Sequence, residues 1–152
     1  MQLKQVDGGG PSDNGGEPRL WVAVLDPGEE VKTALTAFAE REKVQAASFL
    51  AIGAFERATI AYFEWEKKRY KPIPIEEQVE VITLTGDIVR NEKDEPDVHA
   101  HTVLGFSDGS TKGGHLQQGI VRPTLEVTIT ETPGHLVRRM QPGLGIALID
   151  LG

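Results

Sequence analysis

Seven short segments with the residue pattern of β-strands dominate the chain from residue 19 onward. They are RLWVAVLD (19–26), AASFLAIGAF (46–55), RATIAYFEW (57–65), VEVITLTGDIVR (79–90), VHAHTVLGF (98–106), PTLEVTITET (123–132) and GIALIDL (145–151). Several of them alternate apolar and polar residues, and this period of two is typical of strands, whose side chains point alternately to the two faces of a sheet. The connections are mostly short and rich in turn residues, as in SDGS (107–110), which favours antiparallel neighbours. The sequence therefore predicts a large, mainly antiparallel sheet.

One segment between the first two strands has the spacing of an amphipathic helix. It runs from Glu29 to about Lys43, with Gly28 or Asp26 as the cap, and its apolar side chains recur at helical intervals at Val31, Leu35, Phe38 and Ala39. A second, short helix is predicted near 136–141. One main helix followed by six strands indicates an α+β fold in which helices cover one face of the sheet. The other face then needs a cover, which favours a homo-oligomer.

Composition limits both the domain organisation and the ligands. The length of 152 residues fits one domain, predicted over 19–152, and the Gly-, Ser- and Asp-rich residues 1–18 are predicted to form a flexible leader. No apolar run is long enough to span a membrane, and no signal-type segment precedes the domain, which favours the cytoplasm. The chain has no cysteine, so a transition metal could be held tightly only by imidazole and carboxylate groups.

Three of the four histidines gather in VHAHTVLGFSDGSTKGGHL (98–116), as His99, His101 and His115. On a strand, His99 and His101 project from the same face with their Cα atoms about 6.6 Å apart. His115 follows an Asp-Gly turn and a Gly-Gly pair, which would let the backbone return beside that strand. Three histidines in this arrangement are typical of a zinc site with an open fourth position, although two histidines on a polar sheet surface would explain the pattern equally well.

Carboxylates near these histidines could support a metal. Glu126 and Asp97 are candidates to orient an imidazole, while each could instead be an ordinary surface residue. Glu126 or Asp108 could accept a proton if the site activated water as an enzyme. His135 lies in a TPGH turn and is interpreted as a surface residue outside the site. The basic clusters EKKRYK (66–71) and VRR (137–139) are interpreted as solvated surface.

Several motifs taken together resemble a known family. HAHTVLGFSDGSTKGGHL, the following GIVRPTLEVTI, and the earlier VEVITLTGDI and AIGAFERATIAYF are similar to the PPC (plant and prokaryote conserved) domain, from about residue 19 onward. The resemblance implies an α+β fold with a large antiparallel sheet and a homotrimer. It also implies, in prokaryotic members that stand alone, a metal site at the histidines matching His99, His101 and His115. It implies no settled enzymatic activity.

The resemblance and the composition disagree on DNA. In plants the domain follows an AT-hook, an Arg-Gly-Arg-Pro element that enters the minor groove, but residues 1–18 hold a single lysine and no arginine. The plant segment Gly-Arg-Phe-Glu-Ile-Leu, linked to partner recruitment, aligns with residues 77–82, of which only Glu80 and the apolar character remain. A net charge of −7 also disfavours specific DNA binding.

The leading hypothesis is a small trimeric PPC-like protein that binds a divalent metal, zinc above all, through three histidines. Its role would be regulatory or ligand-sensing, and a small molecule could be its ligand. A metal-dependent enzyme and a DNA-associated regulatory protein are the alternatives.

Overall fold

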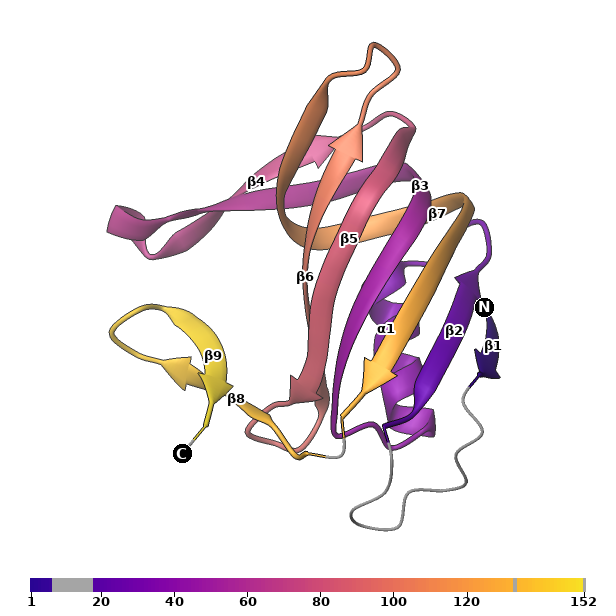
Figure 1. Ribbon diagram of the computed structural model, residues 1–152. Coiled ribbons are helices and arrows are strands. Elements are labelled where there is room, and N and C mark those ends of the chain that lie inside the picture. The colour runs from indigo at the N-terminus through magenta and orange to yellow at the C-terminus, as the bar shows by residue number, and fades with distance from the viewer. Residues whose placement is uncertain (7–17, 133, 152) are drawn as a thin grey trace.

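The computed structural model describes residues 1–6, 18–132 and 134–151, which form one mainly antiparallel sheet with one α-helix against it (Figure 1). The elements are β1 (Gln2–Gln5), β2 (Leu20–Leu25), α1 (Val31–Arg41), β3 (Ala46–Glu64), the 3-10 turn η1 (Trp65–Lys67), β4 (Arg69–Ile75), β5 (Val79–Arg90), β6 (Pro96–Gly105), β7 (Thr111–Glu131), β8 (Val137–Gln141) and β9 (Ile146–Asp150). The α+β class predicted from the sequence is confirmed. Among the described residues, no helix has the length and apolar character needed to cross a membrane.

Two long strands, β3 with 19 residues and β7 with 21, organise the sheet. β7 pairs with β3 along most of its length, from Glu131 opposite Ala47 to His115 opposite Ala61. Its first residues also pair with β6, so that His115 lies opposite His101. Because β3 pairs with β5 and β5 pairs with β6, these four strands close into a ring at one end of the sheet.

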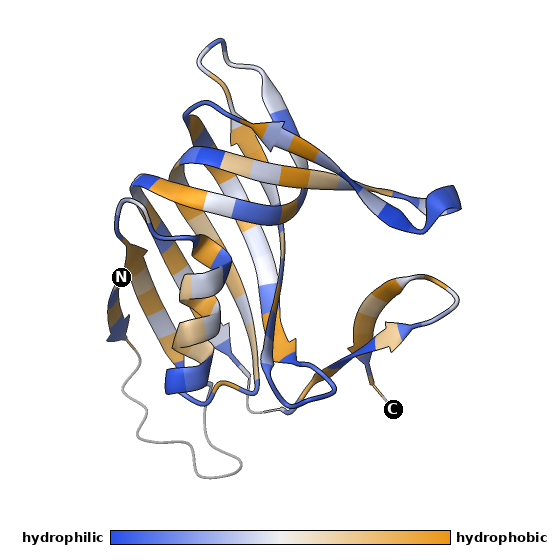
Figure 2. Ribbon diagram, turned by 180° about the vertical axis from the view of Figure 1, so that it is seen from behind, coloured by the Kyte–Doolittle hydropathy of each residue, from blue (hydrophilic) through white to orange (hydrophobic). Residues whose placement is uncertain are grey.

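The helix α1 lies across one face of the sheet, and the sheet presents hydrophobic bands to it (Figure 2). Its side chains that are buried against the core are those predicted from the helical spacing, namely Val31, Leu35, Phe38 and Ala39. The cap is Glu30, one of the acidic residues at the helix start, whose carboxylate accepts hydrogen bonds from the backbone N–H groups of Lys32 and Thr33. Neither Gly28 nor Asp26 is the cap residue.

The remaining strands extend this core in different directions (Figure 1). β2 and then β1 continue the sheet beyond β7, and β4 pairs with the second half of β3 to form a projecting hairpin. β8 and β9 form a separate hairpin, which joins the sheet through one parallel pair between Arg90 of β5 and Val137.

Several boundaries differ from the prediction. The segments predicted at 46–55 and 57–65 belong to one strand up to Glu64, because β3 continues through irregularities in its pairing with β7, and Trp65 begins η1. The second helix predicted near 136–141 is wrong, since residues 137–141 form strand β8. The flexible leader predicted for 1–18 is wrong for residues 2–5, which pair with β2 as β1, and its residues 7–17 lie outside the described part of the chain.

Glycine permits the closest contact between the central strands. A Cβ atom at Gly86 of β5 would lie far inside the contact distance of the His99 carbonyl oxygen, and 3.0 Å from the Cα atom of Ala100. It would also lie 2.6 Å from the ring of Phe49 on β3. Backbone and a packed aromatic ring surround this position, so an added methyl group would force strand β6 away.

We therefore expect Gly86→Ala to lower the free energy of unfolding by about 1–3 kcal/mol, the usual cost of overpacking a core. The matched control is Gly143→Ala, because a Cβ atom there meets nothing within 4 Å. That control should change the free energy by less than about 0.5 kcal/mol. Urea unfolding followed by circular dichroism measures both, and equal midpoints for the two variants would contradict the packing argument.

Candidate metal centre

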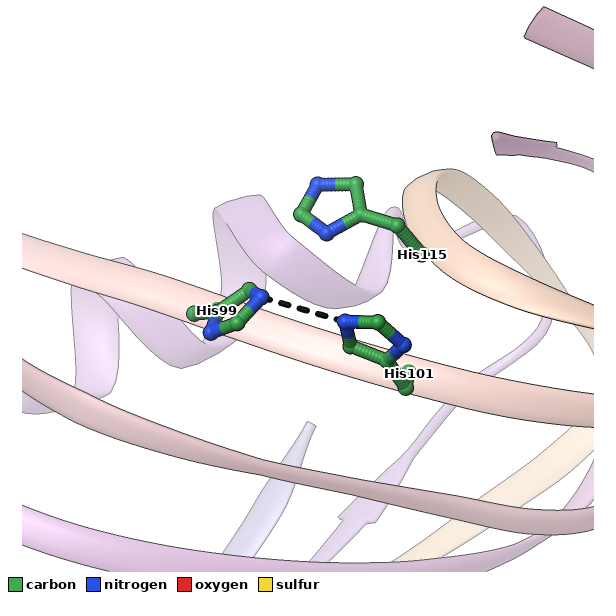
Figure 3. Close-up of side chains that lie close together, drawn as sticks. All are labelled: His99, His101 and His115. Carbon is green, nitrogen blue, oxygen red and sulfur yellow. Dashed lines mark hydrogen bonds between the residues drawn. The ribbon is translucent and has the colours of Figure 1, made fainter. Parts of the chain in front are cut away.

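Two neighbouring strands bring the three clustered histidines together. His99 and His101 project from the same face of β6, as residues two apart on a strand must. His115 stands directly opposite His101 because β6 and β7 pair in that register. Figure 3 shows the three rings facing one another, with ring nitrogens of each directed toward the space between them. The juxtaposition predicted from the sequence is therefore present.

The distances between the rings are those of a site that a small cation could occupy. The ring centroids lie 5.1 to 5.4 Å apart, and one nitrogen from each residue falls within 4.8 Å of the others. Nε2 of His99 and Nε2 of His101 are 3.2 Å apart. Zinc–nitrogen bonds of about 2.05 Å in a tetrahedron place two ligand nitrogens about 3.3 Å apart, so this pair already has the required spacing.

The ring of His115 has one nitrogen without a hydrogen-bond partner among the described residues. Nδ1 of His115 is buried and forms no hydrogen bond with any described residue. Figure 3 shows that Nδ1, the ring nitrogen bonded to Cγ, is the one turned toward the other two rings. The ring itself is fixed by Tyr70 of β4, which stacks on it with centroids 4.5 Å apart. Because a buried polar atom is normally satisfied, this orphan nitrogen is suited to a metal ion.

A carboxylate and a guanidinium lie behind His99. Asp87 of β5 places Oδ2 at 3.8 Å from Nδ1 of His99, on the ring nitrogen that faces away from His101. Arg138 of β8 donates to Oδ1 of Asp87 at 2.5 Å and to Oδ2 of Asp97 at 3.0 Å. A carboxylate behind a histidine commonly orients the ring of a metal ligand.

The surroundings of His99 and His115 lower the pKa of both imidazoles. Burial lowers the pKa of His115 to about 4, helped by the positive charges of His99, Lys32, His101 and Arg138. Burial also lowers the pKa of His99, together with the Arg138 guanidinium, while Asp87 acts in the opposite direction. A neutral imidazole has the free lone pair that a metal requires, so a lowered pKa favours metal binding by His99 and His115.

The other residues singled out in the sequence lie in different places. Asp97 lines the pocket beside the histidines and pairs with Arg138. Glu126 lies elsewhere, opposite Ile52 on β3 and in a different pocket, and Asp108 accepts a hydrogen bond from the N–H of Ser110 within its own turn. His135 is exposed and contacts Gln45.

Sequence reasoning missed Asp87, Arg138 and Tyr70. Asp87 left a signal, as an acidic residue directly before the apolar pair Ile88 and Val89 in VEVITLTGDIVR. Arg138 was interpreted as solvated surface with the rest of VRR. This is wrong, because Arg138 is only 6% exposed and its guanidinium forms ion pairs with two carboxylates. Tyr70 gave no signal, since it stands in the basic cluster 66–71.

Comparison with known proteins identifies the family. The Plants and Prokaryotes Conserved (PCC) domain matches residues 12–133. The chain belongs to this family. The resemblance seen in the sequence motifs is thus confirmed.

Solved structures of similar proteins share this PCC fold. A PPC protein from Pyrococcus horikoshii is 34% identical, with a TM-score of 0.82 over 87% of this chain and 91% of the other. A "metal-containing protein" from Archaeoglobus fulgidus is 31% identical, with a TM-score of 0.79 over 88% and 92%. A "Putative DNA-binding protein" from Ralstonia eutropha JMP134 is 29% identical, with a TM-score of 0.81 over 87% and 91%.

A PCC-like segment also occurs within a longer protein. The bifunctional protein GlmU of Synechococcus sp. (strain JA-3-3Ab) is 28% identical over 139 residues, which is 90% of this chain. The chain spans 21% of the length of that curated relative. The similarity therefore concerns one part of GlmU.

The lowered pKa of His115 predicts how the stability of the metal-free PCC domain changes with pH. Between about pH 6.5 and 4 the unfolded chain binds a proton at this residue and the folded chain does not, so the free energy of unfolding falls as the pH falls. His115→Gln should reduce this fall between pH 7 and 5. His135→Gln, at an exposed residue, serves as the control and should keep the wild-type slope. Urea unfolding of chelator-treated protein measures the slopes, and identical slopes for all three proteins would refute the assignment.

Proposed function

We propose that this PCC-domain protein binds a divalent metal ion, zinc above all, through His99, His101 and His115, in a regulatory or ligand-sensing role. The observation that carries the proposal is the convergence of three ring nitrogens within 4.8 Å, one of them the buried, unpartnered Nδ1 of His115. The similarity to a metal-containing protein of Archaeoglobus fulgidus supports it.

The donor set favours zinc over harder cations. Magnesium and calcium prefer oxygen ligands, whereas imidazole nitrogens suit zinc and its transition-metal neighbours. Closing the cluster around zinc would require the most distant nitrogens to approach by about 1.5 Å, within reach of small side-chain rotations. A zinc ion held by three histidines would offer an open position and act as a Lewis acid toward a ligand.

The geometry favours metal binding. It does not favour catalysis with the proton acceptors that the sequence suggested. A water activated at such a site needs a proton acceptor within hydrogen-bond reach. Glu126 and Asp108, the two acceptors considered, lie in a different pocket and in a distant turn. Asp87 and Asp97 are near the cluster, but both accept hydrogen bonds from Arg138 and are therefore already engaged with another group.

We also propose that the protein forms a homotrimer through the sheet face opposite α1. Leu50, Ile52 and Ile82 are each more than half exposed on β3 and β5, and no helix of the described chain covers them. Their neighbours Phe49 and Ala51 point to the other face and are buried in the core. A cluster of exposed apolar side chains on a central sheet is typical of an interface, and the number three comes from the resemblance to the family.

Specific binding of duplex DNA is not part of the proposal. The net charge is −7, and several basic side chains that could contact phosphates are paired within the chain. Lys67 and Arg69 both lie against Glu64, and Arg139 pairs with Asp150. The DNA-binding description of the Ralstonia protein is therefore not extended to this chain.

Metal binding is tested by elemental analysis of protein purified without a metal-binding tag, before and after dialysis against zinc. We expect one zinc ion per chain, and we expect His101→Ala to lose it because only two ligands remain. His101 is exposed, so this variant should fold normally. His135→Ala, in an exposed histidine outside the cluster, should keep the full metal content. Wild-type protein that holds no transition metal after dialysis would disprove the proposal.

The oligomeric state is tested by size exclusion coupled to light scattering. Wild-type protein should have the mass of three chains, and the double variant Ile52→Asp, Ile82→Asp should have the mass of one. Burying charged side chains in an apolar interface without partners is strongly unfavourable, which is the reason for the expected dissociation. Leu151→Asp changes a side chain that is 84% exposed near the end of the chain and should leave the trimer intact. A wild-type mass of one chain at micromolar concentration would rule out the trimer.

A further inference from the structure

A pocket of about 290 Å³ adjoins the histidine cluster. His99 and His115 form part of its lining, and residues of the β8–β9 hairpin form another part. This hairpin projects from the same side of the sheet as the β3–β4 hairpin, which contributes Tyr70 to the lining (Figure 1). The volume is at the lower end of the range for small-molecule sites, so the pocket suits a ligand of only a few carbon atoms.

Much of the pocket wall is apolar. Val98 of β6 and Tyr70 of β4 contribute to it, together with Met140, Ile146 and Leu148 of the β8–β9 hairpin. Met140 and Leu148 remain 54% and 41% exposed, although they line a concave site. Apolar walls with a few polar groups are typical of pockets that bind small organic molecules.

Two cationic side chains line the pocket, and they differ in how they are paired. Arg138 is buried and donates to both Asp87 and Asp97, so its hydrogen-bonding capacity is directed into the protein. Lys32, on the first turn of α1, forms no ion pair with any carboxylate that the structure describes. Its charge nevertheless reaches His115, whose pKa it helps to lower.

Helix stability does not explain why a lysine stands at position 32, in the first turn of α1. A positive charge in the first turn opposes the helix dipole, whose positive end is there, so it slightly destabilises the helix. The same dipole adds to the positive potential that Lys32 directs into the pocket. An unpaired ammonium at this position is therefore suited to an anion that arrives from outside the protein.

The charge balance depends on the metal. Without a metal, Lys32 and Arg138 offset Asp87 and Asp97, so the surroundings of the pocket carry no net charge. A divalent cation held by the histidines would leave the site with two uncompensated positive charges, beside an apolar wall.

We propose that this pocket binds a small organic anion, a carboxylate with a short apolar substituent. The carboxylate lies between the Lys32 ammonium and the histidine cluster, and the substituent packs against Met140, Ile146 and Leu148. The inference rests on the proposed function, because the positive charge that selects an anion comes mainly from the metal.

The test uses isobutyrate and its neutral isostere isobutyramide, titrated calorimetrically into the full chain. Zinc content is first measured by elemental analysis, which tests the proposed metal site independently of ligand binding. Zinc-loaded protein should bind isobutyrate at least about tenfold more tightly than isobutyramide, since a charge-assisted hydrogen bond is worth more than a neutral one. Metal-free protein should show a smaller preference, because the Lys32 ammonium remains and the metal charge is gone.

Variants identify the residue responsible. Lys32→Met should weaken the binding of isobutyrate by about tenfold, leave the binding of isobutyramide unchanged and keep one zinc ion per chain. Lys4→Met, which removes an exposed lysine on β1, should behave as the wild type. Zinc-loaded protein without a preference for isobutyrate, or an unchanged affinity in Lys32→Met, would overturn the inference and leave the proposed metal site standing. A preference of the same size in metal-free protein would also overturn it, and protein that binds no zinc would overturn both proposals.

Discussion

The pairing of one strand with two partners determines much of this structure. β7 hydrogen-bonds to β3 along one edge and, over its first residues, to β6 along the other, so His115 has Ala61 on one side and His101 on the other. Backbone hydrogen bonds permit only a register in which N–H and C=O groups meet, and a shift by one residue would turn His115 to the opposite face. The histidine cluster is thus a consequence of the sheet register, and it forms as the four strands close.

Small residues let the four strands of the ring approach one another closely. A Cβ atom at Gly114 would lie 2.7 Å from the carbonyl oxygen of Ala61, and one at Gly119 would lie 2.6 Å from the ring of Phe55. Together with Gly86, these positions show where backbones or rings come too close for a side chain. The glycine pair before His115, predicted to let the backbone return beside the strand of His99 and His101, lies inside strand β7. Gly113 permits close contact with β6, and Gly114 permits it with β3.

The sequence predicted the local features well and the contacts between distant segments poorly. Period-two and helical spacing identified most strands and the buried face of α1, because these patterns arise from the geometry of each element. The first half of β7 was missed, since Gly113, Gly114 and Gly119 weaken any strand pattern. The strand β8 was predicted as a helix because a five-residue segment carries too little periodicity to separate the two.

The candidate site shows the same difference between local features and contacts between distant segments. Its three histidines could be predicted because they stand close together in the sequence, two of them on one strand. Asp87, Arg138, Tyr70 and Lys32 come from four other elements, and only the fold places them around the cluster. Arg138 shows the difficulty well: an arginine beside a second arginine indicates a surface, until two aspartates on other strands are found within reach.

The attachment of the β8–β9 hairpin has a consequence for how such proteins diverge. The hairpin meets the main sheet through one backbone pair, at Arg90 and Val137, and through the guanidinium of Arg138. Its outer residues therefore contribute to the pocket wall without belonging to the central core. Substitutions there can alter the size and polarity of an accepted ligand while the closed strands and their histidines stay in place, so ligand preference can evolve separately from folding.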